Sequence, residues 1–225
     1  GHIAKNPANG ANLPRYEKSD IRVLNENEVR EFLIAAEDSP HSALYHLAVK
    51  TGMRQGELFG LKWEDLDWQS GSLSVKRQVT RVPKADWKFS NPKTKSGKRI
   101  IQLGERTLDV LRAQKERVDS LRENAGESWQ EYDLIFPSLK GTPLYPSNMR
   151  RDYNKVLERA GLDRIRFHDL RHTTATLMLN NGIPVIVVSR ILGHAKPSTT
   201  MDIYGHLTQG MQDKAARVMD LIVSS

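Results

Sequence analysis

The sequence predicts a mainly α-helical fold with one small antiparallel β-sheet, an α+β class. Apolar residues recur at helical spacing before residue 62 and again after residue 105, whereas a short middle stretch after Ser70-Gly71 alternates with period two. The chain has 225 residues, of which 38% are hydrophobic and 27% are charged, which is enough for one substantial core.

Three helices are expected first. Asn25 can cap the first, with Glu28 at the capping-box position. Gly52 ends the second, and a short third helix runs from Arg54 to Leu61.

Strands are expected around 73–79 and 100–103, where apolar residues alternate. The basic stretch from Asn91 to Arg99 lies between them and is predicted to form a hairpin tip, since Ser96-Gly97 is typical of a turn. The later helices are expected at about 105–123, 146–160, 168–181, 184–192, 197–204 and 210–223.

The overall charge favours a polyanionic partner. The formal net charge is +7 and the pI is about 9.6, which suits nucleic acid but also fits a merely basic protein. The absence of cysteine excludes disulfides and thiol nucleophiles. No apolar run is long enough to span a membrane, and no signal peptide is visible.

Four short motifs carry possible chemistry. His168 and Arg171 stand three residues apart, an arrangement that can bind a phosphate and move a proton, although any exposed helical turn can carry such a pair. Arg54 follows a Thr-Gly turn and precedes Glu57, with which it can pair. His194 follows the Gly193 helix stop, and Tyr204 comes ten residues later; in isolation, both fit ordinary surface or half-buried positions.

Together and in this order, the motifs resemble the tyrosine recombinase (phage integrase) family, from about residue 21 to the C-terminus. The resemblance implies the catalytic-domain fold of that family over 21–225, and a linker over 1–20 from a missing N-terminal core-binding domain. It implies six catalytic residues: Arg54, Lys95, His168, Arg171, His194 and Tyr204. Lys93 and Lys98 lie close to Lys95, and only the family pattern favours Lys95. Glu57 and His172 are expected to hold the catalytic residues in position.

The implied reaction is site-specific cleavage and rejoining of DNA strands through a 3′-phosphotyrosyl bond to Tyr204, without metal or other cofactor. Arg54, Arg171 and a histidine can meet the charge on the phosphate. Lys95 is expected to protonate the leaving 5′-oxygen, and His168 to assist proton transfer with the tyrosine. A non-catalytic DNA-binding protein, a metal phosphohydrolase and a type IB topoisomerase remain as alternatives.

The expected partner is double-stranded DNA. Arg150, Arg151 and Lys155 lie on a helix that the family places in the major groove, although a solvated helix face explains them equally well. A second basic group can touch the DNA backbone; it comprises Arg77, Arg81, Lys84 and Lys88.

The expected assembly is a homotetramer on DNA and mainly a monomer alone. An apolar stripe on the last helix, which can pack on its own core or on a neighbouring subunit, supports this; it comprises Met211, Ala215, Val218, Met219 and Ile222. A bacterial or phage-encoded protein of this class is expected in the cytoplasm, at the nucleoid. The target sequence, and the choice among integration, excision and resolution, cannot be read from these motifs.

Overall fold

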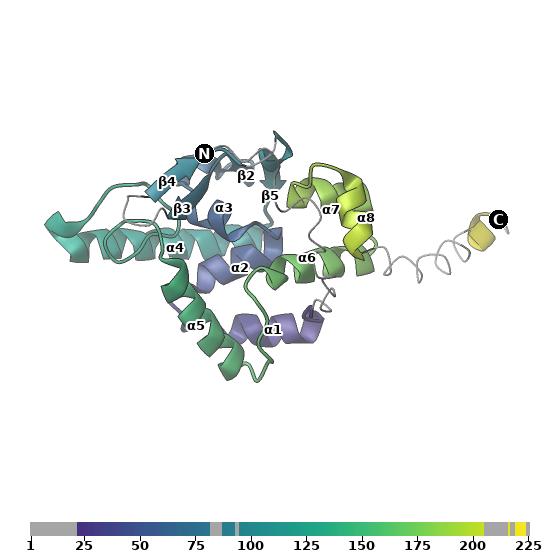
Figure 1. Cartoon of the computed structure of the whole chain (residues 1–225), viewed down its shortest axis with the longest axis horizontal. Helices are drawn as coiled ribbons and strands as arrows, with labels where there is room; N and C mark the ends of the chain where they lie inside the picture. Colours follow the sequence, from purple (N-terminus) through teal and green to yellow (C-terminus); the bar gives the residue numbers. More distant parts are fainter. Residues whose placement is uncertain (1–21, 82–86, 93–94, 205–215, 217–218, 224–225) are drawn as a thin grey trace, which may run out of the picture.

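The computed structural model describes residues 22–81, 87–92, 95–204, 216 and 219–223 (Figure 1). Its named helices are α1 (Glu26–Ala35), α2 (Ser42–Thr51), α3 (Gln55–Phe59), α4 (Glu105–Ala125), α5 (Pro146–Arg159), α6 (Asp169–Asn180), α7 (Val185–Leu192) and α8 (Pro197–Tyr204). The strands are β1 (Leu66–Asp67), β2 (Ser72–Val75), β3 (Gln78–Arg81), β4 (Trp87–Ser90) and β5 (Arg99–Gln102). Short 3₁₀ turns occur at η1 (Trp63–Asp65), η2 (Lys95–Gly97) and η3 (Gly126–Ser128). The predicted α+β class is confirmed.

Local signals in the sequence account for the helix ends. At the start of α1, the Asn25 side chain accepts hydrogen bonds from the backbone N–H groups of Asn27 and Glu28. The Glu28 carboxylate accepts one from the Asn25 backbone N–H, so the predicted capping box is present. Gly52 and Gly193 end α2 and α7 in the left-handed conformation, at φ values of 60° and 71°.

The sheet differs from the prediction, because the described strands form two sheets rather than one. Strands β1, β2 and β5 make a three-stranded antiparallel sheet, and β3 pairs with β4 in a separate two-stranded ribbon. In this ribbon, Arg81 pairs with Trp87 and Gln78 with Ser90, so Asn91–Arg99 follows the second strand and is not the tip of this hairpin. The stretch around Lys95 instead connects β4 of one sheet to β5 of the other. The prediction was wrong because the alternation in β4, where Trp87 and Phe89 flank Lys88, covers only four residues and is too short to mark a strand by itself.

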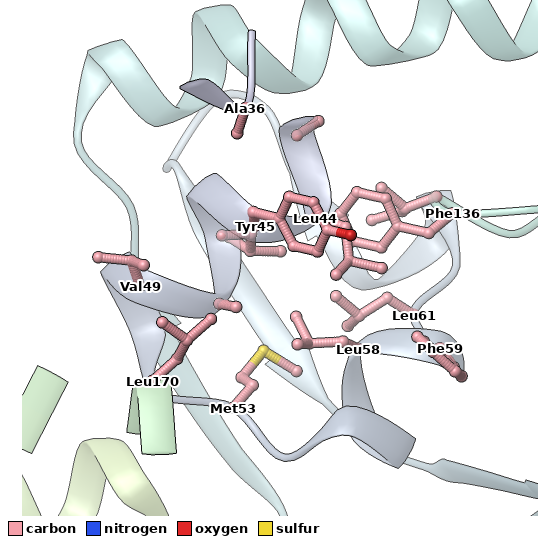
Figure 2. Packing of buried hydrophobic residues seen from close by; sticks show 14 of the residues in the cluster. Ala36, Leu44, Tyr45, Val49, Met53, Leu58, Phe59, Leu61, Phe136 and Leu170 are labelled. Carbon is pink, nitrogen blue, oxygen red and sulfur yellow. The ribbon is translucent and has the colours of Figure 1, made fainter. Parts of the chain in front are cut away.

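The main core lies around α2, which packs against α1, α3, α4 and α6. Figure 2 shows Leu44 and Tyr45 of α2 near Leu58 and Leu61 from the segment that follows, and Val49 of α2 near Leu170 of α6. A smaller buried cluster joins α6 to α7 through Ala175, Leu179, Val188 and Leu192. In Figure 1, α7 lies next to the end of β5, α8 lies beside α7, and α6 runs beneath them. This arrangement brings the ends of α2 and α7 together.

Among the described residues, no helix is both long and apolar enough to cross a membrane.

Candidate active site

The site begins where α2 ends. Gly52 lies so close to α7 that a Cβ added to it would stand 2.6 Å from Cδ2 of Leu192, and its φ of +60° disfavours any other residue. Two residues later, Arg54 occupies the N-cap of α3, and its backbone and guanidinium donate to Glu57 at 3.0 and 2.8 Å. The predicted pairing of Arg54 with Glu57 is therefore present. The Arg54 side chain remains 37% exposed and can reach a ligand.

Arg171 fixes the contact between α2 and α7 from a buried position on α6. Its Nη1 donates to the carbonyl oxygens of Gly52 and Leu192, each at 2.8 Å. These are the last carbonyls of two helices, which the helix geometry leaves without partners inside the helix. Because Arg54 also approaches the carbonyl of the next residue, Gly193, at 3.5 Å, both arginines meet at the end of α7.

His194 follows the left-handed turn at Gly193 and lies beside both arginines. Burial, followed by the charges of Arg171 and Arg54, lowers its pKa from 6.5 to about 4. Its Nδ1 lies 2.7 Å from the hydroxyl of Thr200, a fully buried residue on α8. At neutral pH, His194 is therefore an uncharged imidazole held by a hydroxyl.

His168 occupies the N-cap position of α6 and is exposed. His172 lies one turn later, and the centroids of the two rings are 5.3 Å apart. Desolvation and then Arg171 lower the pKa of His168, and Asp169 opposes them only in part. The pKa of His172 is lowered by desolvation and then by the charge of His168. An imidazole that is neutral near pH 7 can accept a proton from a nucleophile.

Arg99 is a residue of the site that the motifs did not indicate. Its side chain is 6% exposed, and its Nη2 donates to Glu57 at 2.9 Å. Burial would raise the pKa of Glu57, but the hydrogen bond and charge of Arg99, together with Arg54, outweigh it and lower that pKa. The signal was present in the sequence: Arg99 shares the inward face of its strand with Ile101, whereas Ile100 is 69% exposed.

Two predicted catalytic residues are placed by their backbone alone. Lys95 opens η2, and Tyr204 ends α8; their side chains lie outside the described part of the chain. Of the competing lysines, Lys98 is exposed and Lys93 lies outside the described residues.

The candidate DNA-binding residues form two groups. Arg150, Arg151 and Lys155 are all exposed on α5. In the second group, Arg77 forms ion pairs with Asp65 and Glu64, so its main role is structural. Arg81 lies over the Tyr145 ring at 4.6 Å, Lys88 is exposed, and Lys84 lies outside the described residues. A concavity of about 610 Å³ runs between α3 and the β3–β4 ribbon, with Arg54 and Arg81 in its lining.

Within the described ranges, no group of three or more His, Asp or Glu side chains is arranged to hold a metal ion. The described residues do bring fixed guanidinium groups together with neutral imidazoles. This combination is suited to binding a phosphate group.

Comparisons with known proteins identify the family and the fold. The sequence model of the phage integrase family matches residues 22–211. A tyrosine recombinase XerC-like protein of Caldanaerobacter subterraneus is 31% identical over 98% of this chain, which spans 61% of that relative's length. The Tn1549 transposon integrase, solved with a circular intermediate DNA, matches with a TM-score of 0.72 and 22% identity, covering 92% of this chain and 68% of that one. A lambda integrase tetramer bound to a Holliday junction matches with a TM-score of 0.58 and 25% identity, covering 91% of this chain and 54% of that one.

Proposed function

Because the chain belongs to the phage integrase family, we propose that it is the catalytic part of a site-specific tyrosine recombinase, which cleaves and rejoins DNA strands. One observation carries the proposal. Arg54 and Arg171 are anchored to the successive carbonyls at the end of α7, beside the neutral imidazole of His194. Such preorganised donors stabilise the charge that develops on a phosphate in the transition state.

The reaction then needs a nucleophile and two proton transfers. The hydroxyl oxygen of Tyr204 attacks the phosphorus, its proton passes to His168, and the bond from phosphorus to the 5′-oxygen breaks. Lys95 gives a proton to that oxygen, leaving a free 5′-hydroxyl and a 3′-phosphotyrosyl bond. Attack by another 5′-hydroxyl reverses these steps and joins a new strand, so the reaction consumes no energy source.

The proposed partner is double-stranded DNA, and the proposed assembly on it is a homotetramer. The exposed α5 arginines supply a basic face for the duplex. Both similar structures described above were solved with DNA, and one of these is a tetramer on a Holliday junction. We also propose that residues 1–20 link this domain to a preceding DNA-binding domain, and that the protein acts on DNA in the cytoplasm of a bacterium.

Trapping of the covalent intermediate tests the proposal. A nicked duplex loses a short 5′-hydroxyl fragment after cleavage, so the protein–DNA adduct accumulates and the attached residue can be mapped by mass spectrometry. We expect attachment at Tyr204, and no adduct from Tyr204→Phe although DNA affinity stays nearly unchanged. An adduct formed by Tyr204→Phe would refute the assignment.

Two further measurements separate the alternatives. The adduct should form equally well in EDTA, whereas a metal phosphohydrolase would be inhibited. Recombinant products from two duplexes would distinguish a recombinase from a type IB topoisomerase, which only relaxes supercoils.

A further inference from the structure

Arg99 contacts the Lys95 segment, the partner of Arg54 (Glu57) and the end of α7 together. Its Nη1 donates to the carbonyl of Gly97 at 3.1 Å, in the same 3₁₀ turn that begins at Lys95. Its Nη2 donates to Glu57 at 2.9 Å, and its Nε donates to the carbonyl of Ile191. A planar guanidinium can satisfy three acceptors in fixed directions, which a lysine ammonium on a flexible stem cannot do.

The packing around Arg99 leaves little freedom. A Cβ at Gly193 would stand 2.9 Å from Nη1 of Arg99 and 3.0 Å from the carbonyl of Ser96. The η2 backbone therefore lies directly against the α7 turn that precedes His194. Since η2 belongs to neither sheet, side-chain contacts such as those of Arg99 hold it in place.

We propose that Arg99 is a positioning residue for Lys95, holding η2 against the arginine site so that the lysine reaches the leaving 5′-oxygen. This inference rests on the proposed function, in which Lys95 is the proton donor. It predicts that loss of the three hydrogen bonds of the Arg99 guanidinium impairs protonation of the leaving 5′-oxygen more than it impairs charge stabilisation by Arg54.

A change of leaving group tests this directly. In a duplex whose scissile 5′-bridging oxygen is replaced by sulfur, the leaving thiolate needs no proton, because a thiol is far more acidic than an alcohol. A defect in proton donation should disappear on this substrate, and a defect in charge stabilisation should remain. Cleavage rates are compared on the oxygen and sulfur duplexes for the wild-type chain, Lys95→Ala, Arg54→Ala, Arg99→Lys and Arg99→Gln.

Arg99→Lys keeps a positive charge beside Glu57 but loses the planar guanidinium and its three directed hydrogen bonds. We expect it to slow cleavage of the oxygen substrate by about 10- to 10²-fold, as displacement of a catalytic group by about 1 Å does. On the sulfur substrate, it should return to within about 3-fold of the wild-type rate, as Lys95→Ala should, given the size of general-acid effects. Arg54→Ala should stay slow on both substrates. Arg112→Lys, in an exposed ion pair with Asp109 on α4, is the matched control and should cleave normally.

Several outcomes would overturn the inference. One is an Arg99→Lys defect of equal size on both substrates, and another is no defect at all. A Lys95→Ala defect that sulfur does not relieve would also overturn it. If Arg99→Lys does not fold, Arg99→Gln gives the same comparison, and hydrogen exchange at residues 95–98 should be faster than in the wild-type chain while exchange in α2 is unchanged. No adduct from the wild-type chain on either substrate would refute the proposed function itself.

Discussion

Thr200 shows how a single buried hydroxyl can set the chemistry of the proposed site. Its Oγ1 lies 2.7 Å from Nδ1 of His194, and the residue is fully buried. If this hydroxyl donates to Nδ1, the proton of the neutral ring is on Nε2, which then becomes a donor toward a phosphate oxygen.

Thr200→Val keeps the shape of the side chain and removes the hydroxyl, so it should free the His194 ring and slow adduct formation about 10-fold, within the range of a lost hydrogen bond. Thr199→Val is the matched control, because Thr199 is the exposed neighbour on the same helix. The measurement is the rate of adduct formation at saturating protein, compared between the two variants and the wild-type chain. Equal rates for the two variants would contradict this role of Thr200.

The lowered pKa of His194 also predicts how stability depends on pH. The pKa is about 4 in the folded chain against 6.5 for an unperturbed histidine, so between these values the unfolded chain binds more protons. The free energy of unfolding should therefore fall as the pH drops from 6.5 toward 4. His41, His46, His168 and His172 act in the same direction, since their pKa values are also lowered.

Urea titrations at several pH values can isolate the contribution of His194 to the pH dependence of the free energy of unfolding. His194→Gln should remove on the order of 1–3 kcal/mol of this pH-dependent change. An identical pH slope in the variant and the wild-type chain would show that His194 is not the buried neutral ring described above.

At the scale of elements, Gly193 lies between the end of α7 and the segments that we propose to be catalytic. Its φ is +71°, and a Cβ there would crowd both Arg99 and Ser96. Gly161 has a similar φ of +65°, but nothing lies within 4 Å of a Cβ added to it. Comparing alanine substitutions at the two glycines therefore separates two contributions to the loss of stability: the left-handed backbone conformation, which both positions share, and the steric clash, which occurs only at Gly193.

Gly161→Ala should cost about 1–2 kcal/mol of stability, the penalty of a left-handed alanine, and leave cleavage unchanged. Gly193→Ala should cost more and also slow cleavage, because the added methyl group displaces η2. Thermal unfolding and cleavage rates of both variants provide the comparison. If both variants behave alike, the close approach at Gly193 has no functional role.

The sequence predicted the helices better than the strands for a physical reason. Each helix carries its own apolar spacing and end signals, so α7 and α8 begin and end within about one residue of the predicted bounds. Strand β1 has only two residues, and β2 pairs with β5 across 23 or more intervening residues. No local pattern therefore specifies β1 or the pairing of β2 with β5. Arg54 and Glu57 were predictable because one helical turn joins them. For Arg99, the strand pattern indicates only that it shares the inward face with Ile101; its contacts were not predictable, because its partners come from three separate elements.

At the scale of the whole molecule, the net charge of +7 predicts how DNA binding responds to salt. With about five to eight phosphates contacted, log K should fall with log salt at a slope of about −5 to −7. Arg150→Gln and Arg151→Gln on α5 should each reduce the slope by about 1. Arg112→Gln on α4 is the control, and fluorescence anisotropy over a salt series measures all three. A slope near zero would contradict the backbone-contact hypothesis.

The last helix bears on assembly. Of the predicted apolar stripe, Met219 and Ile222 are described and are 56% and 65% exposed, and their neighbours Leu221 and Val223 are also exposed. Exposed apolar groups on one short segment favour burial against another surface. We therefore predict that the chain alone is mainly monomeric, since one short helix offers little interface area, and that this segment joins subunits on DNA.

Deletion of residues from Met211 onward tests this prediction. The truncated chain should fold with an almost unchanged melting temperature, because the described apolar residues that it loses are exposed rather than in the core. It should bind a single site on DNA but form less of the multi-subunit complex, and cleavage should change with assembly. Light scattering of the full and truncated chains, each with and without DNA, measures the stoichiometry. If the truncated chain unfolds, the helix belongs to its own core and cannot serve as the link between subunits.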